Sequence, residues 1–272
     1  MRVLVSVDME GIAGVAVAAD VSPGTVEYER NRQLMTAEAS AAVRGALAFA
    51  PDVEVVVADA HGPFCNLLAA DLDPRATLVR GRPRPGGMVT DIATVDAAIF
   101  IGYHGRAGTP TSVLSHTIHG CIADVRCNGR SLGEIGLNAA LGAFHGVPTV
   151  LVSGDDTVAA EASEVIPGVV TVAVKRALGS RATESLHPAQ ACRRIEAAVP
   201  AALAARPAAP APLLAGPVIV EVDLRYEGMA EPPLLVPGME RSGPRTVRYA
   251  APDFPTAFDV VRLIAVLSAA AG

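Results

Sequence analysis

Six short apolar runs recur along the 272-residue chain and constrain its fold more than any other feature. They are rich in β-branched residues, and each runs out into polar or glycine-rich residues: VLVSVD, VEVVVADAHG, DAAIFIGYHG, PTVLVSGDD, VVTVAVK and PVIVEVDL. Near-continuous apolar strands are typical of sheets that are covered on both faces. The pattern therefore predicts a sheet buried between layers of helices.

Helical patterns lie between these runs. A segment from about residue 26 to residue 50 places its apolar residues on one face, a second begins after Gly133, and a third is expected from Thr256 to Ala271. Strands that alternate with helices favour an α/β fold, here a three-layer α/β/α architecture with a largely parallel sheet. Asn128-Gly129 between two apolar arms predicts a hairpin with a type I′ turn.

A proline- and alanine-rich stretch, residues 207–217, reads as a surface connector. It predicts an α/β metal-binding catalytic part over residues 1–206. A smaller C-terminal α+β subdomain, residues 218–272, is expected to pack on it.

Composition excludes several classes of function. The formal net charge of -6 gives no basic field for nucleic acid. No segment approaches the roughly twenty apolar residues of a membrane helix, and the first apolar run stops at Asp8, too early for a signal segment. The four cysteines form no C-x-x-C pair, which predicts reduced thiols and a cytoplasmic location.

Carboxylates and imidazoles follow several of the predicted strands. Asp8 and Glu10 follow the first, His61 the second and His104 the third. Open parallel sheets bind ligands beyond the carboxyl ends of their strands, so these side chains are expected at one edge. Acidic residues at one strand end are often only loop residues or helix caps, but several ends that mix carboxylates with imidazoles indicate a metal site, with zinc the best match.

Two metal ions fit this set better than one. Glu134, at the start of a predicted helix, adds a fifth candidate ligand, and a carboxylate can bridge two ions as in two-metal hydrolases. Ordinary alternatives stay open: His104 as a core histidine and Glu134 as a first-turn acid. Asp155 and Asp156 read as a helix cap rather than as ligands.

His116, in the segment SVLSHTIHG, is a candidate catalytic residue. The neighbouring Ser115 has no G-x-S-x-G context, so a serine nucleophile is not indicated. An imidazole titrates near working pH, which favours His116 as a general acid or base.

Eight motifs together resemble one known family, the zinc-dependent D-aminopeptidases of the bacterial dipeptide transport operon. They occur in the same order and at compatible spacing: SVDMEGIAG, YERNRQLMTAEA, ADAHG, FIGYHGRAGTP, LSHT, GRSLGEIGLNA, GVPTVLVSGDD and AVKRALGS. The resemblance is strong over the first two thirds of the chain and weaker beyond.

The resemblance implies roles for these residues. Asp8 would bridge two zinc ions, with Glu10 and His61 completing one site and His104 and Glu134 the other. His116 matches the histidine regarded as catalytic, with its role as nucleophile or as general acid or base left open. The family also implies a homo-oligomer, a decamer of two rings with sites facing an internal channel.

Two further residues lie inside matching motifs. Asn138 and Lys175 are candidate substrate-binding residues, and Lys175 is expected to pair with the free carboxylate of a dipeptide. Their ordinary alternatives are a polar helix face and a lysine at a helix edge.

The sequence thus predicts a dinuclear zinc aminopeptidase that acts on short peptides, with substrates of the D-Ala-D-Ala type. Handedness depends on pocket walls outside these motifs. The alternatives are a two-metal amidase or phosphoesterase on a non-peptide substrate, and a dipeptide-binding protein without chemistry.

Overall fold

The computed structural model describes residues 1–271. Its larger sheet has seven strands in the order β3-β2-β1-β4-β7-β8-β9. All neighbours are parallel except β8 and β9, which form an antiparallel pair at one edge. The strands are β1 (Arg2–Val7), β2 (Glu54–Asp59), β3 (Ala76–Val79), β4 (Ala97–Ile101), β7 (Thr149–Asp155), β8 (Val170–Gly179) and β9 (Ala182–Ser185).

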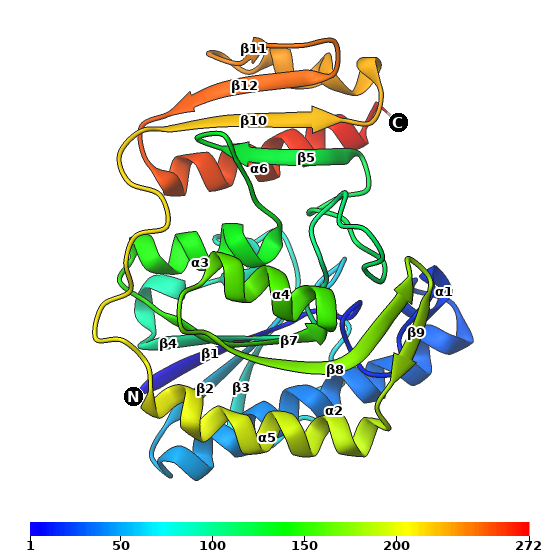
Figure 1. Cartoon of the computed structure of the whole chain (residues 1–272), viewed down its shortest axis with the longest axis vertical. Helices are drawn as coiled ribbons and strands as arrows, with labels where there is room; N and C mark the ends of the chain where they lie inside the picture. Colours follow the sequence, from blue (N-terminus) through cyan, green and yellow to red (C-terminus); the bar gives the residue numbers. More distant parts are fainter. Residues whose placement is uncertain (272) are drawn as a thin grey trace.

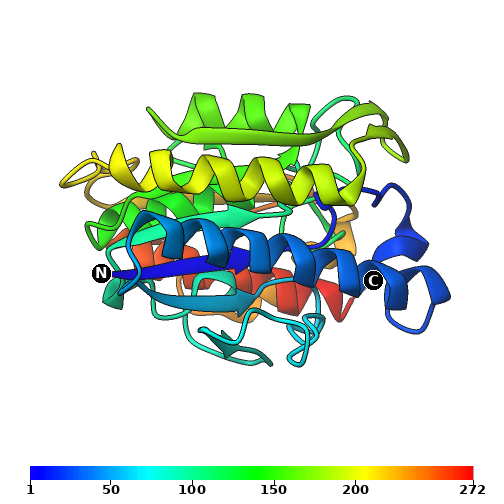
Figure 2. The ribbon, with the colours of Figure 1, turned by 90° about the horizontal axis from the view of Figure 1, so that it is seen from below.

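Helices cover both faces of this sheet. On one face α2 (Val26–Phe49) and α5 (Pro188–Ala204) run side by side, blue and yellow in the view from below (Figure 2). On the other face lie α3 (Glu134–Phe144) and α4 (Asp156–Val165) (Figure 1). The strand residues alternate accordingly: Val3 and Val5 pack with α2 and α5, whereas Leu4 packs toward α3. The predicted three-layer α/β/α fold is confirmed.

A second sheet lies beyond α3, at the top of Figure 1. It has the antiparallel order β11-β12-β10-β5-β6, and helix α6 (Phe254–Ala269) packs on β10 and β12 and against α3. Its strands are β5 (Ile122–Cys127), β6 (Arg130–Ser131), β10 (Val218–Leu224), β11 (Glu240–Arg241) and β12 (Thr246–Ala251). Short helical segments complete the chain: α1 (Ala18–Val21), η1 (Gly87–Val89), η2 (Ile92–Thr94), η3 (Glu227–Ala230) and η4 (Pro232–Leu235).

The second sheet is not built from C-terminal residues alone. The hairpin β5–β6, from the middle of the chain, pairs with β10, so the small sheet joins two distant segments. The turn of this hairpin is the predicted one, since Asn128 and Gly129 both have positive φ, 52° and 79°. The division of the chain at residues 207–217 remains a prediction. No helix or strand lies between α5 and β10.

Local signals account for the helix ends. Helix α2 begins at Val26, where the side chain of Thr25 accepts a hydrogen bond from the N–H of Tyr28. Helix α6 begins two residues earlier than the sequence predicts, because the Asp253 side chain caps it by accepting from Thr256 N–H.

None of the helices in residues 1–271 is long and apolar enough to cross a membrane. The four cysteines are free thiols.

Strand order also locates the site. The chain leaves β1 toward β2 on one side of the sheet and later returns to β4 on the other side of β1. At such a switch the following loops diverge and open a crevice at the carboxyl ends of the strands. The edge beyond β1 and β4 is therefore where a ligand is expected.

Candidate metal centre

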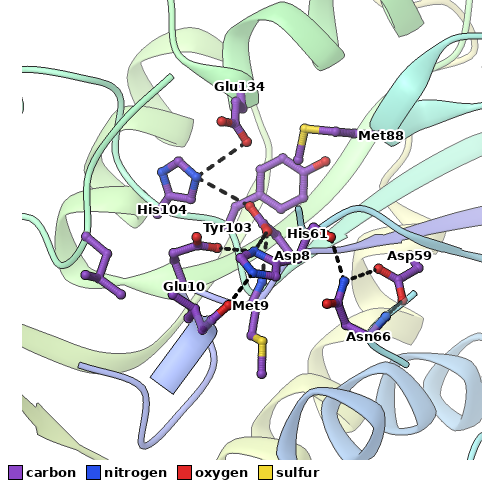
Figure 3. Close-up of polar contacts among 12 residues, drawn as sticks. Asp8, Met9, Glu10, Asp59, His61, Asn66, Met88, Tyr103, His104 and Glu134 are labelled. Atoms are coloured by element: carbon purple, nitrogen blue, oxygen red, sulfur yellow. Dashed lines mark hydrogen bonds and ion pairs between the residues drawn. The ribbon is translucent and has the colours of Figure 1, made fainter. Parts of the chain in front are cut away.

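Three neighbouring strands and one helix bring five side chains together at this edge. Asp8 and Glu10 follow β1, His61 follows β2, His104 follows β4, and Glu134 is the first residue of α3. All five are buried, and Figure 3 shows them gathered around Asp8. The structure thus brings together all the residues that the sequence predicts as metal ligands.

Asp8 lies between two halves of the cluster. Its Oδ1 is 3.3 Å from Nδ1 of His61, and its Oδ2 is 3.4 Å from Nε2 of His104. Each imidazole has a second carboxylate partner: Glu10 Oε2 lies 2.9 Å from His61 Nδ1, and Glu134 Oε2 lies 3.4 Å from His104 Nε2. Two carboxylate-imidazole pairs therefore share one central carboxylate.

The histidines each use one ring nitrogen on a backbone carbonyl. His61 Nε2 lies 2.9 Å from Val21 O, and His104 Nδ1 lies 3.0 Å from Gly105 O. A carbonyl only accepts, so these nitrogens carry hydrogen, and the other nitrogen of each ring faces the carboxylates. His104 Nε2 is buried without a hydrogen-bond partner among the described residues. Metal-binding histidines show this arrangement, with one nitrogen donating and the other free to coordinate.

The electrostatics of the cluster also fit a metal. Burial, with the negative charge of Glu10, raises the pKa of Asp8 to about 8. Burial alone would raise the pKa of Glu10 as well, but His61 holds that pKa well below its usual value. The carboxylates in turn raise the pKa of His61 to about 12, against the effect of burial. A divalent cation would relieve the repulsion between the carboxylates, and this set of nitrogen and oxygen donors suits zinc.

The ligand atoms are close enough for metal ions. Single atoms of Asp8, Glu10 and His104 all lie within 4.8 Å of one another, and so do atoms of His104, His116 and Glu134. These two groups differ from the pairs that the family resemblance implies, because His104 belongs to both. His61 approaches the cluster through Asp8 and Glu10.

His116 lies at the edge of the cluster and is partly accessible, with 26% of its side chain exposed. Its ring stacks on His104, and its Nε2 lies 3.8 Å from Glu134 Oε1. Nδ1 is 2.9 Å from Leu114 O, which assigns hydrogen to Nδ1 and leaves Nε2 as an acceptor. Burial and the neighbouring His104 lower the pKa of His116, so the ring is neutral at pH 7. Such a group can accept and return a proton.

Comparison with known proteins identifies the family. The family model described as D-aminopeptidase matches residues 1–263. The chain belongs to the D-aminopeptidase family. It is 35% identical to the D-aminopeptidase of Bacillus subtilis (strain 168) over 270 residues, 98% of each chain. This confirms the family resemblance that the sequence motifs indicate.

A solved structure supports the same assignment. The Zn-dependent D-aminopeptidase DppA from Bacillus subtilis, described as a self-compartmentalizing protease, superposes with a TM-score of 0.95. The match is at 35% identity and covers 99% of this chain and 98% of that one. Members of this family are peptidases, so the protein is a hydrolase of peptide bonds, as predicted. The amidase, phosphoesterase and binding-protein alternatives are not favoured.

Lys175 points toward the loop after β1. It lies on β8, is 3% exposed, and its Nζ donates to the carbonyl oxygens of Glu10, Ile12 and Val15 at 2.5, 3.0 and 2.7 Å. Because an ammonium has three hydrogens, these contacts use its full donor capacity. The geometry favours a role in holding the loop after β1 over the predicted contact with a substrate carboxylate.

Asn138 lies one turn after Glu134 on α3 and is also buried. Its Nδ2 donates to Tyr103 Oη at 3.1 Å, and Tyr103 Oη lies 2.8 Å from Ser6 Oγ, which donates to Met88 O. This series of hydrogen bonds links β1, the end of β4 and α3, the elements that carry Asp8, His104 and Glu134. Asn138 therefore takes part in a buried hydrogen-bond network, and its contact with substrate stays a prediction.

Sequence reasoning missed Tyr103 and Ser6. A signal for Tyr103 existed, since a tyrosine at the end of a buried strand needs a partner for its hydroxyl.

Asp59, which ends β2, lies outside the cluster (Figure 3). It accepts from the N–H of Asn66, whose Nδ2 donates to His61 O at 2.6 Å, so Asp59 shapes the loop that carries His61. Asp155 is a helix cap as predicted, accepting from Val158 N–H.

Proposed function

We propose that this protein is a dinuclear zinc aminopeptidase that removes the N-terminal residue of short peptides, with D-amino-acid peptides of the D-Ala-D-Ala type as substrates. The observation that carries the proposal is the position of Asp8, whose two oxygens face different imidazoles. A shared central carboxylate with a nitrogen and an oxygen donor on each side is a ligand set for two ions. The related DppA structure is of a Zn-dependent D-aminopeptidase.

The five ligands would divide between two ions. Asp8 would bridge them, Glu10 and His61 would complete one site, and His104 and Glu134 the other. Zinc bound at such a centre acts as a Lewis acid on the scissile carbonyl and lowers the pKa of water.

His116 would carry the proton in this reaction. Its neutral Nε2 would accept a proton from the attacking water and return it to the leaving amine nitrogen, which must be protonated when the peptide bond breaks. The bond from Nδ1 to Leu114 O fixes the ring so that Nε2 faces the cluster. A substrate would approach the cluster from the side of His116, because this side chain is 26% exposed whereas that of Glu134 is 4% exposed.

Assembly would restrict the substrates. The related DppA is described as self-compartmentalizing, and by the same arrangement this chain would form a homo-oligomer, a decamer, whose sites face an internal channel. Only short or unfolded peptides would reach them. The location of such an enzyme would be the cytoplasm.

The experiment measures hydrolysis of D-Ala-D-Ala and L-Ala-L-Ala together with bound zinc per subunit. Wild type is compared with Asp8→Asn, which keeps the shape of the side chain but removes its charge. Asp71→Asn, at an exposed position, is the matched control. We expect two zinc ions and turnover of the D-dipeptide in wild type and the control, with loss of both in Asp8→Asn. Two bound zinc ions without turnover of either dipeptide would contradict the proposed substrate.

A further inference from the structure

The loop after β1, residues 10–15, carries the Glu10 carboxylate and is held by side chains from elsewhere in the fold. Lys175 reaches it from β8, although β4 and β7 lie between β8 and β1. Its Nζ takes three of the loop's carbonyl oxygens, those of Glu10, Ile12 and Val15. One buried cation thus binds this loop at both ends and in the middle.

The loop's N–H groups are also bound by distant side chains. Ala13 N–H donates to Glu38 Oε1 on α2 at 2.9 Å, and Gly14 N–H donates to Ser185 Oγ on β9 at 2.8 Å. The Ala13 bond is buried, whereas the Gly14 bond lies at the surface. A buried N–H such as that of Ala13, which lacks a sheet or helix partner, depends on a side-chain contact for its hydrogen bond. The conformation of the loop therefore depends on side chains that are remote in sequence.

We propose that Lys175 is a positioning residue that fixes the loop of residues 10–15, and with it the Glu10 carboxylate, and so sets the zinc affinity of the half of the centre formed by Glu10 and His61. This inference rests on the proposed assignment of ligands to two ions. It goes beyond that assignment because Lys175 contacts neither zinc nor substrate.

The contacts make the effect specific to one half. Lys175 binds the main chain of Glu10 itself. The other half is held differently: His104 Nδ1 bonds Gly105 O, and Glu134 Oε1 accepts from Ile118 N–H at 2.6 Å. None of the hydrogen bonds of Lys175 reaches His104 or Glu134. Loss of the ammonium should therefore loosen Glu10 and leave the second half in place.

A lysine suits this position for a physical reason. Burying an ammonium is costly unless it is fully hydrogen-bonded and near opposite charge. Burial lowers the pKa of Lys175 to about 8, and the charges of Asp155, Glu38 and Glu10 oppose this shift. Three carbonyls supply the hydrogen bonds that the buried ammonium needs. A methionine has a similar unbranched shape but no donors, so Lys175→Met removes the hydrogen bonds and keeps most of the packing.

The experiment is a zinc titration of the full-length protein against a competing chelator, which resolves the two binding steps. We expect Lys175→Met to bind one zinc equivalent about 10- to 100-fold more weakly, the range for loss of a residue that orients a ligand, with the other step unchanged. Glu10→Gln identifies which step belongs to the Glu10 half. Arg176→Met is the matched control, because the next side chain along β8 is exposed and pairs with exposed Glu184.

The outcomes of the titration distinguish a failure of the positioning role from a failure of the dinuclear centre. Equal weakening of both steps, or no change in either, would overturn the positioning role. Should Lys175→Met fail to fold, Lys175→Arg takes its place: the longer guanidinium keeps the charge but displaces the loop, and the same one-sided weakening is expected. Fewer than two zinc equivalents in wild type would instead contradict the dinuclear centre itself, so the two failures are distinguishable.

Discussion

His104 and His116 stack face to face, with ring centroids 4.0 Å apart and an angle of 15° between the ring planes. The two rings have opposite surroundings. The carboxylates around His104 raise its pKa well above the usual value, against the effect of burial. His116 is partly buried, and the neighbouring His104 helps to lower its pKa. The carboxylates thus favour positive charge at His104, whereas His116 is suited to moving a proton.

His116→Asn should separate proton transfer from zinc binding. The asparagine amide keeps a donor near the position of Nδ1 for Leu114 O but has no counterpart of Nε2. We expect kcat for D-Ala-D-Ala to fall about 100- to 10,000-fold, the usual range for loss of a general acid or base. Zinc per subunit, measured on the same sample, should stay at the wild-type level. His145→Asn, at an exposed position, should leave both unchanged. Loss of zinc in His116→Asn would contradict the separation.

Tyr103→Phe tests the hydrogen-bond chain under the centre. The substitution keeps the ring, which stacks on Phe100 at 4.8 Å, and removes only the hydroxyl. Asn138 Nδ2 is then left with the weak acceptor Met88 Sδ, at 3.4 Å. Leaving a buried donor poorly satisfied costs about 1–3 kcal/mol, so we expect the free energy of unfolding of the zinc-free protein to fall by that amount in urea.

The same variant should affect zinc. Because the chain links β1, β4 and α3, we expect weaker binding in both steps of the chelator titration, unlike the one-sided effect of Lys175→Met. Tyr226→Phe removes the hydroxyl of an exposed tyrosine and is the control. Unchanged stability together with unchanged zinc affinity would show that the hydrogen bonds of Tyr103 do not support the metal centre.

The sequence shows which candidate ligands lie together, because they stand at recognisable places in the strand pattern. Strand ends of a parallel sheet share one edge, so Asp8, His61 and His104 are placed together by the strand pattern alone. The contacts of Lys175 are different: they join β8 to the loop after β1, two segments far apart in the sequence, and no local pattern encodes them. The pairing of β5 with β10 is likewise a contact between distant segments. Local signals therefore give the elements and the ligands but not the contacts that hold them.

Glu38→Gln should change how stability depends on pH. Burial raises the pKa of Glu38 to about 7 from its usual 4.5. Between these values the unfolded chain has lost the proton while the folded protein keeps it, so the free energy of unfolding falls as pH rises. Below pH 4.5 and above pH 7 the two states bind the same number of protons, and the contribution is constant.

The size of this effect follows from linkage. A pKa difference of this size corresponds to about 3 kcal/mol in total. Urea unfolding of zinc-free wild type and Glu38→Gln across this pH range should show wild type losing that amount relative to the variant. Glu27→Gln, at an exposed position on the same helix, is the control. A difference between wild type and Glu38→Gln that does not vary with pH would rule out a buried titration at this position.

Gly11→Ala should prevent assembly of the centre, because at Gly11 the loop after β1 crosses the end of β4 at close range. Gly11 N–H donates to Gly102 O at 2.8 Å, and a Cβ at Gly11 would lie within 2 Å of Tyr103 O, a backbone atom next to His104. Backbone cannot move aside there without displacing Asp8 or His104. We expect little folded protein and loss of zinc binding, measured by circular dichroism and zinc content. A Cβ at Gly120 would meet nothing within 4 Å, so Gly120→Ala should behave as wild type. A folded Gly11→Ala protein with two bound zinc ions would contradict this account of the crossing.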